Sequence, residues 1–266
     1  VFDIARLKNG NLLISTDRLV RIPYYLSGLY EMTMTGKVVR EYSMPGGYHH
    51  DKIEMADGNL LVLSEDLESD TVEDTMVLLD RNTGEVLRTW DFSDFLIPGE
   101  SKSGSWSAED WFHCNALWYD ANTNSVTLSG RHINAIVNID YDTGKLNWIL
   151  GDPEGWSDER KKYLFTPVGD DEFDWQYEQH ACVITPDGDV MCFDNGHYRS
   201  CDPEKYILNR DNFSRGVRYR INTDDMTIQQ VWQYGKELGQ HFFSKYICNV
   251  EYYGENHYMI HSGGIQ

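Results

Sequence analysis

The stretch that decides the fold is HDKIEMADGNLLVL, residues 50–63. Two apolar runs flank the dipeptide Asp57-Gly58, and Asp-Gly between such runs is a strong short-range signal for a β-hairpin. Because a type I′ turn needs φ > 0 at both central residues, we expect that turn type here. The same strand–turn–strand pattern recurs at residues 4–14, 113–128, 180–191 and 248–260. The chain is therefore built on an internal repeat.

A second hairpin follows each of the first four copies of this pattern. These hairpins occupy residues 29–39, 76–90, 135–148 and 217–232. Three of them end in tryptophan, at Trp90, Trp148 and Trp232, and we expect these rings to wedge between neighbouring sheets. One complete unit of the repeat therefore contributes four strands.

Four strands per unit predict an all-β fold, a β-propeller of four-stranded blades. Residues 1–266 would form one domain that holds four blades and the first half of a fifth, and we expect it to be incomplete at both ends. Long polar loops at 91–110, 151–179 and 196–215 should lie on one face, with a short helix near 157–163. A two-sheet β-sandwich is the weaker alternative, because sandwiches lack this four-strand period.

Composition narrows the classes of partner. The chain has 43 Asp and Glu against 23 Lys and Arg, a net charge of −20, which repels nucleic acid backbones. No apolar run is long enough for a membrane span. The five cysteines form no CxxC pair, which argues against a structural zinc site, and Cys182 and Cys192 fall in predicted strands.

Three histidines occupy similar positions in different blades. His50 lies eight residues before Gly58 and His180 lies eight before Gly188, while His113 falls in register within about a residue. The innermost strands of a propeller face its central channel, so the three imidazoles should meet there. His49 should point to the opposite face by strand alternation. A satisfied core or turn histidine is the alternative for each one alone. His180 is the next-to-last residue of the aromatic stretch 175–181.

Two more residues join the histidines by spacing. Asn115 lies two residues after His113 on the same strand, and Arg131 ends the partner strand as a cation without an evident partner. An Arg fork, an amide and imidazoles form a donor-rich pocket for a tetrahedral oxyanion. A surface salt bridge is the alternative for Arg131.

Two other functions stay open at this point. A metal-dependent propeller lyase would use His50, His113 and His180 as ligands for Zn²⁺ or Mn²⁺, although Arg131 would repel the cation. A non-catalytic binding propeller would use the histidines structurally.

Four runs in order resemble the aryl-sulfate sulfotransferases, with His50-Asp51 matching an earlier family histidine. The runs are Asp110–Asn115, Ser129–His132, Trp148–Gly151 and Gln179–Ala181. The resemblance implies a six-bladed propeller that moves a sulfuryl group from a phenolic sulfate ester to an acceptor phenol. The reaction is expected to be ping-pong through a sulfated histidine, without the nucleotide donor PAPS, a metal or a cofactor.

Site roles follow from the resemblance residue by residue. His180 would be the nucleophile, and a last-blade hydroxyl would map to Ser244. Four donors would hold the sulfuryl oxygens: His50, His113, Asn115 and Arg131. One of His50 and His113 would pass the proton to the leaving phenolate, and the sequence leaves open which.

The resemblance also sets expectations beyond the site. Aryl sulfates and phenols would be the small-molecule partners, and a homodimer and an extracytoplasmic location, periplasmic or secreted, are expected. The chain departs from some relatives in having no cysteine between Cys114 and Cys182, so a disulfide just upstream of the nucleophile is not expected.

Overall fold

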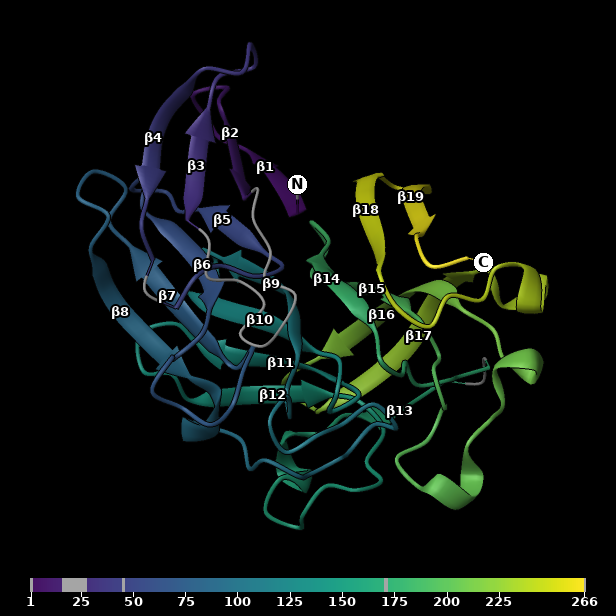
Figure 1. The fold of residues 1–266 in the computed structure, drawn as a ribbon. Helices are drawn as coiled ribbons and strands as arrows, with labels where there is room; N and C mark the ends of the chain where they lie inside the picture. The colour runs from purple at the N-terminus through teal and green to yellow at the C-terminus, as the bar shows by residue number, and fades with distance from the viewer. Residues whose placement is uncertain (1, 16–27, 45, 170–171, 266) are drawn as a thin grey trace.

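The computed structural model describes residues 2–15, 28–44, 46–169 and 172–265. Its strands form five sheets arranged around a common centre, and all but one pair of neighbouring strands are antiparallel (Figure 1). Within each of the first three sheets, strands that are consecutive in the chain lie side by side. The predicted β-propeller of four-stranded blades is confirmed in this arrangement.

The first three sheets have four strands each. The first contains β1 (Phe2–Arg6), β2 (Leu12–Ser15), β3 (Leu29–Met32) and β4 (Val38–Tyr42). The second contains β5 (Lys52–Glu54), β6 (Leu60–Ser64), β7 (Thr75–Leu79) and β8 (Val86–Asp91). The third contains β9 (Cys114–Asp120), β10 (Ser125–Gly130), β11 (Ala135–Asp140) and β12 (Leu146–Leu150).

The fourth sheet has a strand that the repeat does not predict. It contains β14 (His180–Ile184), β15 (Val190–Asp194), β16 (Arg215–Asn222) and β17 (Thr227–Tyr234), with β13 (Thr166–Pro167) added outside β17. β13 pairs in parallel with β17 and comes from the long insertion after β12. The last sheet is the half-unit of β18 (Cys248–Gly254) and β19 (His257–Ser262).

The hairpin turns differ from the expected type. Gly58 has φ 91, but Asp57 is not in the left-handed region, so only one of the two residues expected at the centre of the turn has positive φ. The Gly58 amide donates to the Met55 carbonyl at 3.1 Å, which describes a type I turn followed by a left-handed glycine. The type I′ prediction is therefore wrong, although the hairpins it indicated are present.

Large side chains fill the space between neighbouring sheets. The Trp90 ring of the second sheet lies 5.2 Å from the Tyr141 ring of the third, and Trp232 lies 4.6 Å from Tyr258 of the last sheet. Trp148 packs into a core cluster that also contains Cys182 of the next blade. The predicted wedging of these tryptophans is confirmed.

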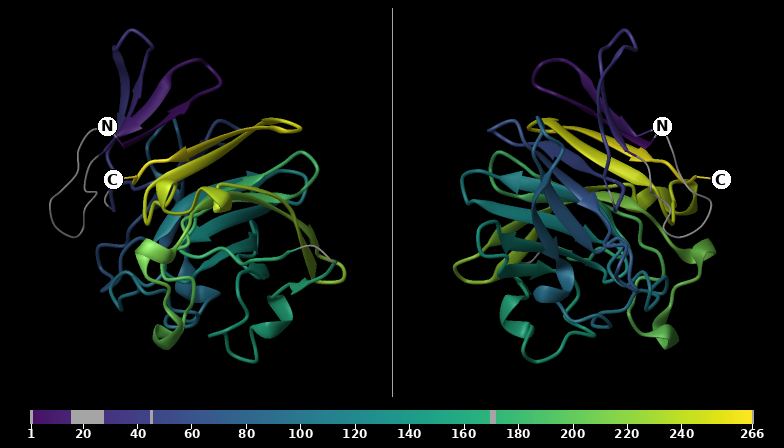
Figure 2. Two further views of the ribbon diagram at one scale, coloured as in Figure 1. Left: turned by 90° about the vertical axis from the view of Figure 1, so that its right-hand side faces the viewer. Right: turned by 60° about the vertical axis from the view of Figure 1, so that its left-hand side comes forward.

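The inner strands and the insertions set the position of the site. β5, β9, β14 and β18 contact one another in that order around the centre. The long insertions lie together on one side of the sheets (Figure 2). They also touch, since the Ser101 amide donates to the Gly155 carbonyl at 3.0 Å.

The helical segments are short 3₁₀ turns. They are η1 (Phe92–Asp94), η2 (Lys161–Tyr163), η3 (Pro203–Lys205), η4 (Asn209–Asp211) and η5 (Lys236–His241). η2 falls where a short helix is expected. Among the described residues, no helix is long and apolar enough to cross a membrane.

Candidate active site

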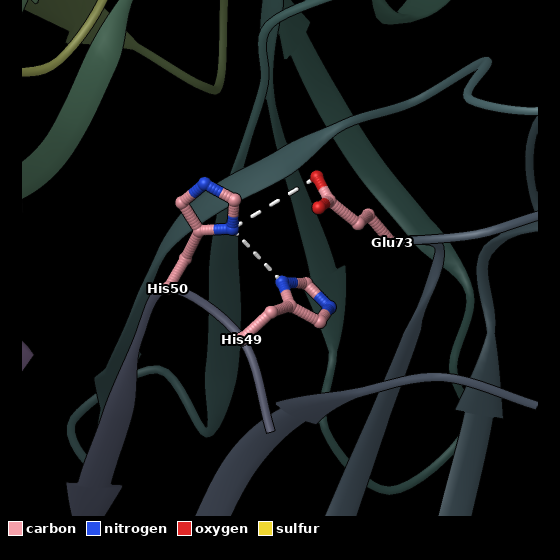
Figure 3. Close-up of side chains that lie close together, drawn as sticks. All are labelled: His49, His50 and Glu73. Atoms are coloured by element: carbon pink, nitrogen blue, oxygen red, sulfur yellow. Dashed lines mark hydrogen bonds and ion pairs between the residues drawn. The ribbon is translucent and has the colours of Figure 1, made fainter. Parts of the chain in front are cut away.

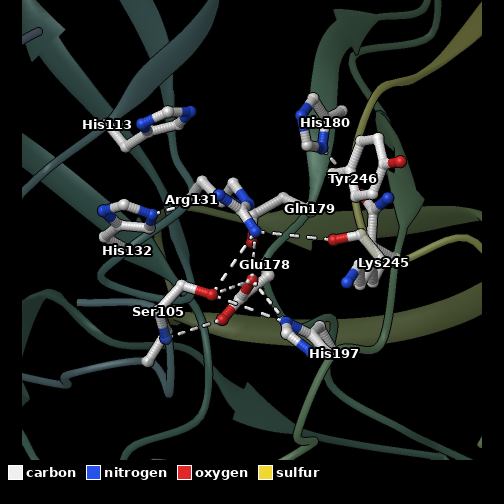
Figure 4. Close-up of polar contacts among 12 residues, drawn as sticks. Ser105, His113, Arg131, His132, Glu178, Gln179, His180, His197, Lys245 and Tyr246 are labelled. Atoms are coloured by element: carbon white, nitrogen blue, oxygen red, sulfur yellow. Dashed lines mark hydrogen bonds and ion pairs between the residues drawn. The ribbon is translucent and has the colours of Figure 1, made fainter. Parts of the chain in front are cut away.

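The ends of the inner strands bring the predicted histidines to one place. The rings of His50 and His113 lie 5.2 Å apart, centre to centre. His113 and His180 face a common space with Arg131 between them (Figure 4). The positions are not equivalent in detail, because His180 is the first residue of β14, whereas β9 begins after His113 and β5 begins at Lys52.

His180 is a neutral imidazole in one tautomer. Its Nδ1 lies 2.8 Å from Asn195 Oδ1, and Asn195 Nδ2 donates to the Ser244 carbonyl at 2.8 Å, so His180 Nδ1 must be the donor. Burial and the nearby Arg131 lower the pKa of His180 to about 3. The lone pair is therefore on Nε2, which accepts the Ile247 amide at 3.3 Å.

His113, unlike His180, carries a positive charge. Its Nδ1 lies 2.8 Å from Asp110 Oδ2 and 2.8 Å from Glu73 Oε2. Burial opposes a charge on this ring, but the carboxylates of Glu73 and Asp110 outweigh burial and raise the pKa of His113 to about 10. His113 is thus a cation at neutral pH, with Nδ1 held by carboxylates and Nε2–H on the far side of the ring.

His49 and His50 do not point to opposite faces. Their Nδ1 atoms are 3.0 Å apart, and Glu73 approaches the same pair, 3.9 Å from His50 Nδ1 (Figure 3). The alternation argument is wrong because neither histidine belongs to a strand, and His50 is in the left-handed region with φ 46. His49 Nε2 is 3.1 Å from the Ser64 carbonyl, so the His49 ring is held between Ser64 and His50.

Arg131 has a partner that the sequence did not reveal. Its Nη2 lies 2.7 Å from Glu178 Oε2, and the Glu178 side chain is fully buried. Arg131 Nη1 lies 3.1 Å from His132 Nε2. The reading of Arg131 as an unpaired cation is therefore wrong, because Glu178 lies close to it in space but 47 residues away in sequence.

Asn115 and Ser244 lie beside the histidines but serve the backbone. Asn115 Nδ2 donates to the Gln179 carbonyl at 2.7 Å, which fixes the residue before His180. The Ser244 hydroxyl donates to the Tyr246 carbonyl at 2.8 Å and accepts the Gly264 amide at 2.9 Å. Ser244 is thus brought near His180 through Asn195, with its hydroxyl engaged in the loop, and substrate binding by either residue stays a prediction.

Two groups of side chains have metal-ligand atoms within 4.8 Å of one another among the described residues. They are His49, His50 and Glu73, and Asp110, His113 and His132. Neither contains His180, so the trio required by the metal-lyase hypothesis is not gathered as one ligand set. His132 Nδ1 also lies 2.6 Å from the Asp110 carbonyl, which occupies that nitrogen with a hydrogen bond.

Several aromatic side chains in and near the matched runs belong to the core. Trp111, Phe112 and Phe165 are almost completely buried. Trp111 Nε1 donates to Asp74, and Tyr177 donates to Asp152. Tyr246 is a half-buried aromatic residue whose ring lies beside His180 (Figure 4).

The sequence model of the family described as Arylsulfotransferase (ASST) matches residues 2–266. The chain belongs to this arylsulfotransferase family. It is 28% identical over 295 residues to an arylsulfate sulfotransferase AssT of Escherichia coli O6:H1, covering 88% of this chain and 48% of that protein. It is 28% identical over 283 residues to AssT of Lelliottia amnigena, with 84% and 46% covered. The chain thus spans about half the length of these curated relatives.

A solved structure supports the fold of this member of the arylsulfotransferase family. A protein of unknown function from Bacteroides caccae superposes with a TM-score of 0.52 at 13% identity, covering 89% of this chain and 67% of that one. At such identity the likeness concerns the fold alone.

Sequence reasoning missed the carboxylates behind the cations. Glu73, Asp110 and Glu178 each contact a predicted site residue. Two signals were present in the sequence: Asp110 opens the run that contains His113, and Glu178 stands two residues before His180. Neither signal says which cation the carboxylate would meet, since that depends on loop packing.

Proposed function

We propose that the protein transfers a sulfuryl group from an aryl sulfate ester to an acceptor phenol, in two steps through a sulfated His180. The observation that carries this proposal is the neutral His180, with its Nε2 lone pair fixed, beside the cations Arg131 and His113. A neutral imidazole is a competent nucleophile near neutral pH, and fixed cations stabilise charge on transferring oxygens.

In the first step His180 Nε2 attacks sulfur and the bond from sulfur to the phenolic oxygen breaks. The electron pair of that bond goes to the leaving phenolate, which takes a proton from His113 Nε2. In the second step the acceptor phenol returns a proton to His113, its oxygen attacks sulfur, and the nitrogen–sulfur bond breaks to restore the Nε2 lone pair.

His113 is the better candidate than His50 for this proton transfer. The pKa of His113 is raised to about 10, whereas burial lowers the pKa of His50 to about 3 despite Glu73 nearby. Only His113 therefore carries a spare proton at neutral pH. His50 and Arg131 would hold the sulfuryl oxygens.

The proposal is tested with 4-nitrophenyl sulfate and a second phenol, without PAPS, by following release of 4-nitrophenol. We expect release that depends on the acceptor, and its loss in His180→Asn. His257→Asn, at an exposed histidine of β19, is the matched control and should keep full activity. Equal turnover in His180→Asn and wild type would overturn the nucleophile assignment.

A radiolabelled donor tests the intermediate directly. Wild-type protein mixed with ³⁵S-labelled donor, without acceptor, should retain about one label per chain, and His180→Asn should retain none. Label on another residue would contradict the assignment of His180 as the nucleophile, and no retained label in wild type would contradict the covalent step. The homodimer and the extracytoplasmic location stay predictions of the family resemblance.

A further inference from the structure

Glu178 is a buried carboxylate at the meeting point of three insertions. Its Oε2 accepts from Arg131 Nη2 at 2.7 Å, from Ser105 Oγ at 2.9 Å and from His197 Nδ1 at 3.0 Å (Figure 4). Its Oε1 accepts the Ser105 amide at 3.1 Å. Ser105 and His197 come from the insertions at 91–110 and 196–215, and Glu178 itself from 151–179.

The backbone of Glu178 is also fixed. The residue has φ 46, in the left-handed region that side chains other than glycine rarely adopt, and its amide donates to Asn134 Oδ1 at 3.0 Å. The next residue, Gln179, is held by Nε2 contacts to the carbonyls of Gly130 and Ala135. This strained segment, held by several hydrogen bonds, places the Glu178 carboxylate against Arg131 and leads into the strand that begins with His180.

Glu178 carries a full negative charge. Burial alone would raise its pKa, but the hydrogen bond from His197 and the charge of Arg131 outweigh burial and lower the pKa to about 2. The guanidinium that would face a sulfuryl group is therefore already half of an ion pair.

The same arrangement holds for the other cation of the site. Arg131 faces Glu178, and His113 faces both Glu73 and Asp110. Two cations thus stand in direct contact with three carboxylates, so these five side chains together carry no excess positive charge. Such a site tolerates a second negative charge poorly, because the added charge meets carboxylates without an added cation.

We propose that Glu178 is a positioning and specificity-determining residue, which fixes the Arg131 guanidinium and restricts the site to singly charged sulfuryl groups over doubly charged phosphoryl groups. This inference rests on the proposed function for the identity of the substrate. The two groups are similar in shape, so charge is the property by which a site can separate them.

The test measures binding of two ligands at pH 7.5 by calorimetry. Phenyl phosphate has a charge of about −2 there, and phenylmethanesulfonate has a single charge and no ester bond to break. Wild type should prefer the sulfonate. Glu178→Gln keeps the size of the side chain and removes its charge, so it should shift the ratio of the two dissociation constants toward phosphate by about tenfold or more.

Two further variants separate charge from structure. Glu178→Asp keeps the charge but shortens the side chain, so its binding ratio should stay wild-type while turnover of 4-nitrophenyl sulfate falls. Glu204→Gln makes the same change of net charge at an exposed position of the 196–215 loop and should alter neither quantity. An unchanged ratio in Glu178→Gln, or an equal shift in Glu204→Gln, would overturn the inference.

The outcome also separates this inference from the proposed function. If wild type transfers sulfuryl groups but Glu178→Gln leaves the ratio of dissociation constants unchanged, the inference about Glu178 is wrong and the proposed reaction stands. A shifted ratio in a protein that transfers no sulfuryl group removes the proposed reaction and leaves the charge selection by Glu178 standing, because binding is measured without turnover.

Discussion

At the scale of single residues, two histidines of the site differ in charge because buried carboxylates contact only one of them. His113 contacts Glu73 and Asp110 and is cationic, whereas His180 contacts the Asn195 amide and is neutral. Register and motif selected both histidines and Arg131 from the sequence as candidates, and their roles stay predictions. Their protonation could not be predicted, because the deciding partners come from loops whose packing has no sequence period.

The charge on His113 predicts the pH dependence of the proposed reaction. A group with a raised pKa keeps its proton below that pKa and loses it as pH rises through it, here about 10. We expect the turnover number to stay high from pH 7 to pH 9 and to fall as pH rises through 10. A decline that begins near pH 7 would contradict the assignment of His113 as the acid.

His113→Gln should then remove this basic limb and lower turnover by about 10²-fold, a typical loss for a general acid. The loss should be larger for phenyl sulfate than for 4-nitrophenyl sulfate, because the poorer leaving group depends more on protonation. His257→Gln is the matched control. Equal losses for both donors would indicate that His113 binds the sulfuryl group without moving a proton.

At the scale of elements, alternating apolar residues and turn dipeptides were sufficient to locate the hairpins. They could not give β13, whose two residues pair in parallel with β17, since so short a strand carries no recognisable pattern. They also missed the turn type, because glycine at one position satisfies both a type I′ turn and a type I turn with a left-handed residue.

The inter-sheet tryptophans predict a loss of stability that depends on burial. Trp90 is 4% exposed and packs against Tyr141 and the Arg88 guanidinium. Trp90→Ala should lower the free energy of unfolding by about 3–5 kcal/mol, the range for large cavities. Trp118 is 36% exposed, so Trp118→Ala should lower the free energy of unfolding clearly less. Urea unfolding measures both, and equal costs would contradict the wedge role of Trp90.

At the scale of the whole molecule, the charge of −20 opposes the approach of an anionic donor. Salt screens this repulsion, because the Debye length shortens from about 30 Å at 0.01 M to about 8 Å at 0.15 M. We expect kcat/KM for an aryl sulfate to rise with salt over this range, while kcat/KM for a neutral phenol acceptor stays constant. A fall in kcat/KM for the aryl sulfate with added salt would show that the cations of the site attract the donor more strongly than the net charge repels it.

The contact between the Ile247 amide and His180 Nε2 has a consequence for the order of events. The amide occupies the lone pair that would attack sulfur, so this nitrogen can bond to the amide or to a sulfuryl group, never to both. Ile247 is β-branched and has φ 54, a conformation that the surrounding loop must impose. On the proposed mechanism, donor and loop therefore compete for one nitrogen atom, and between turnovers the reactive histidine is kept capped.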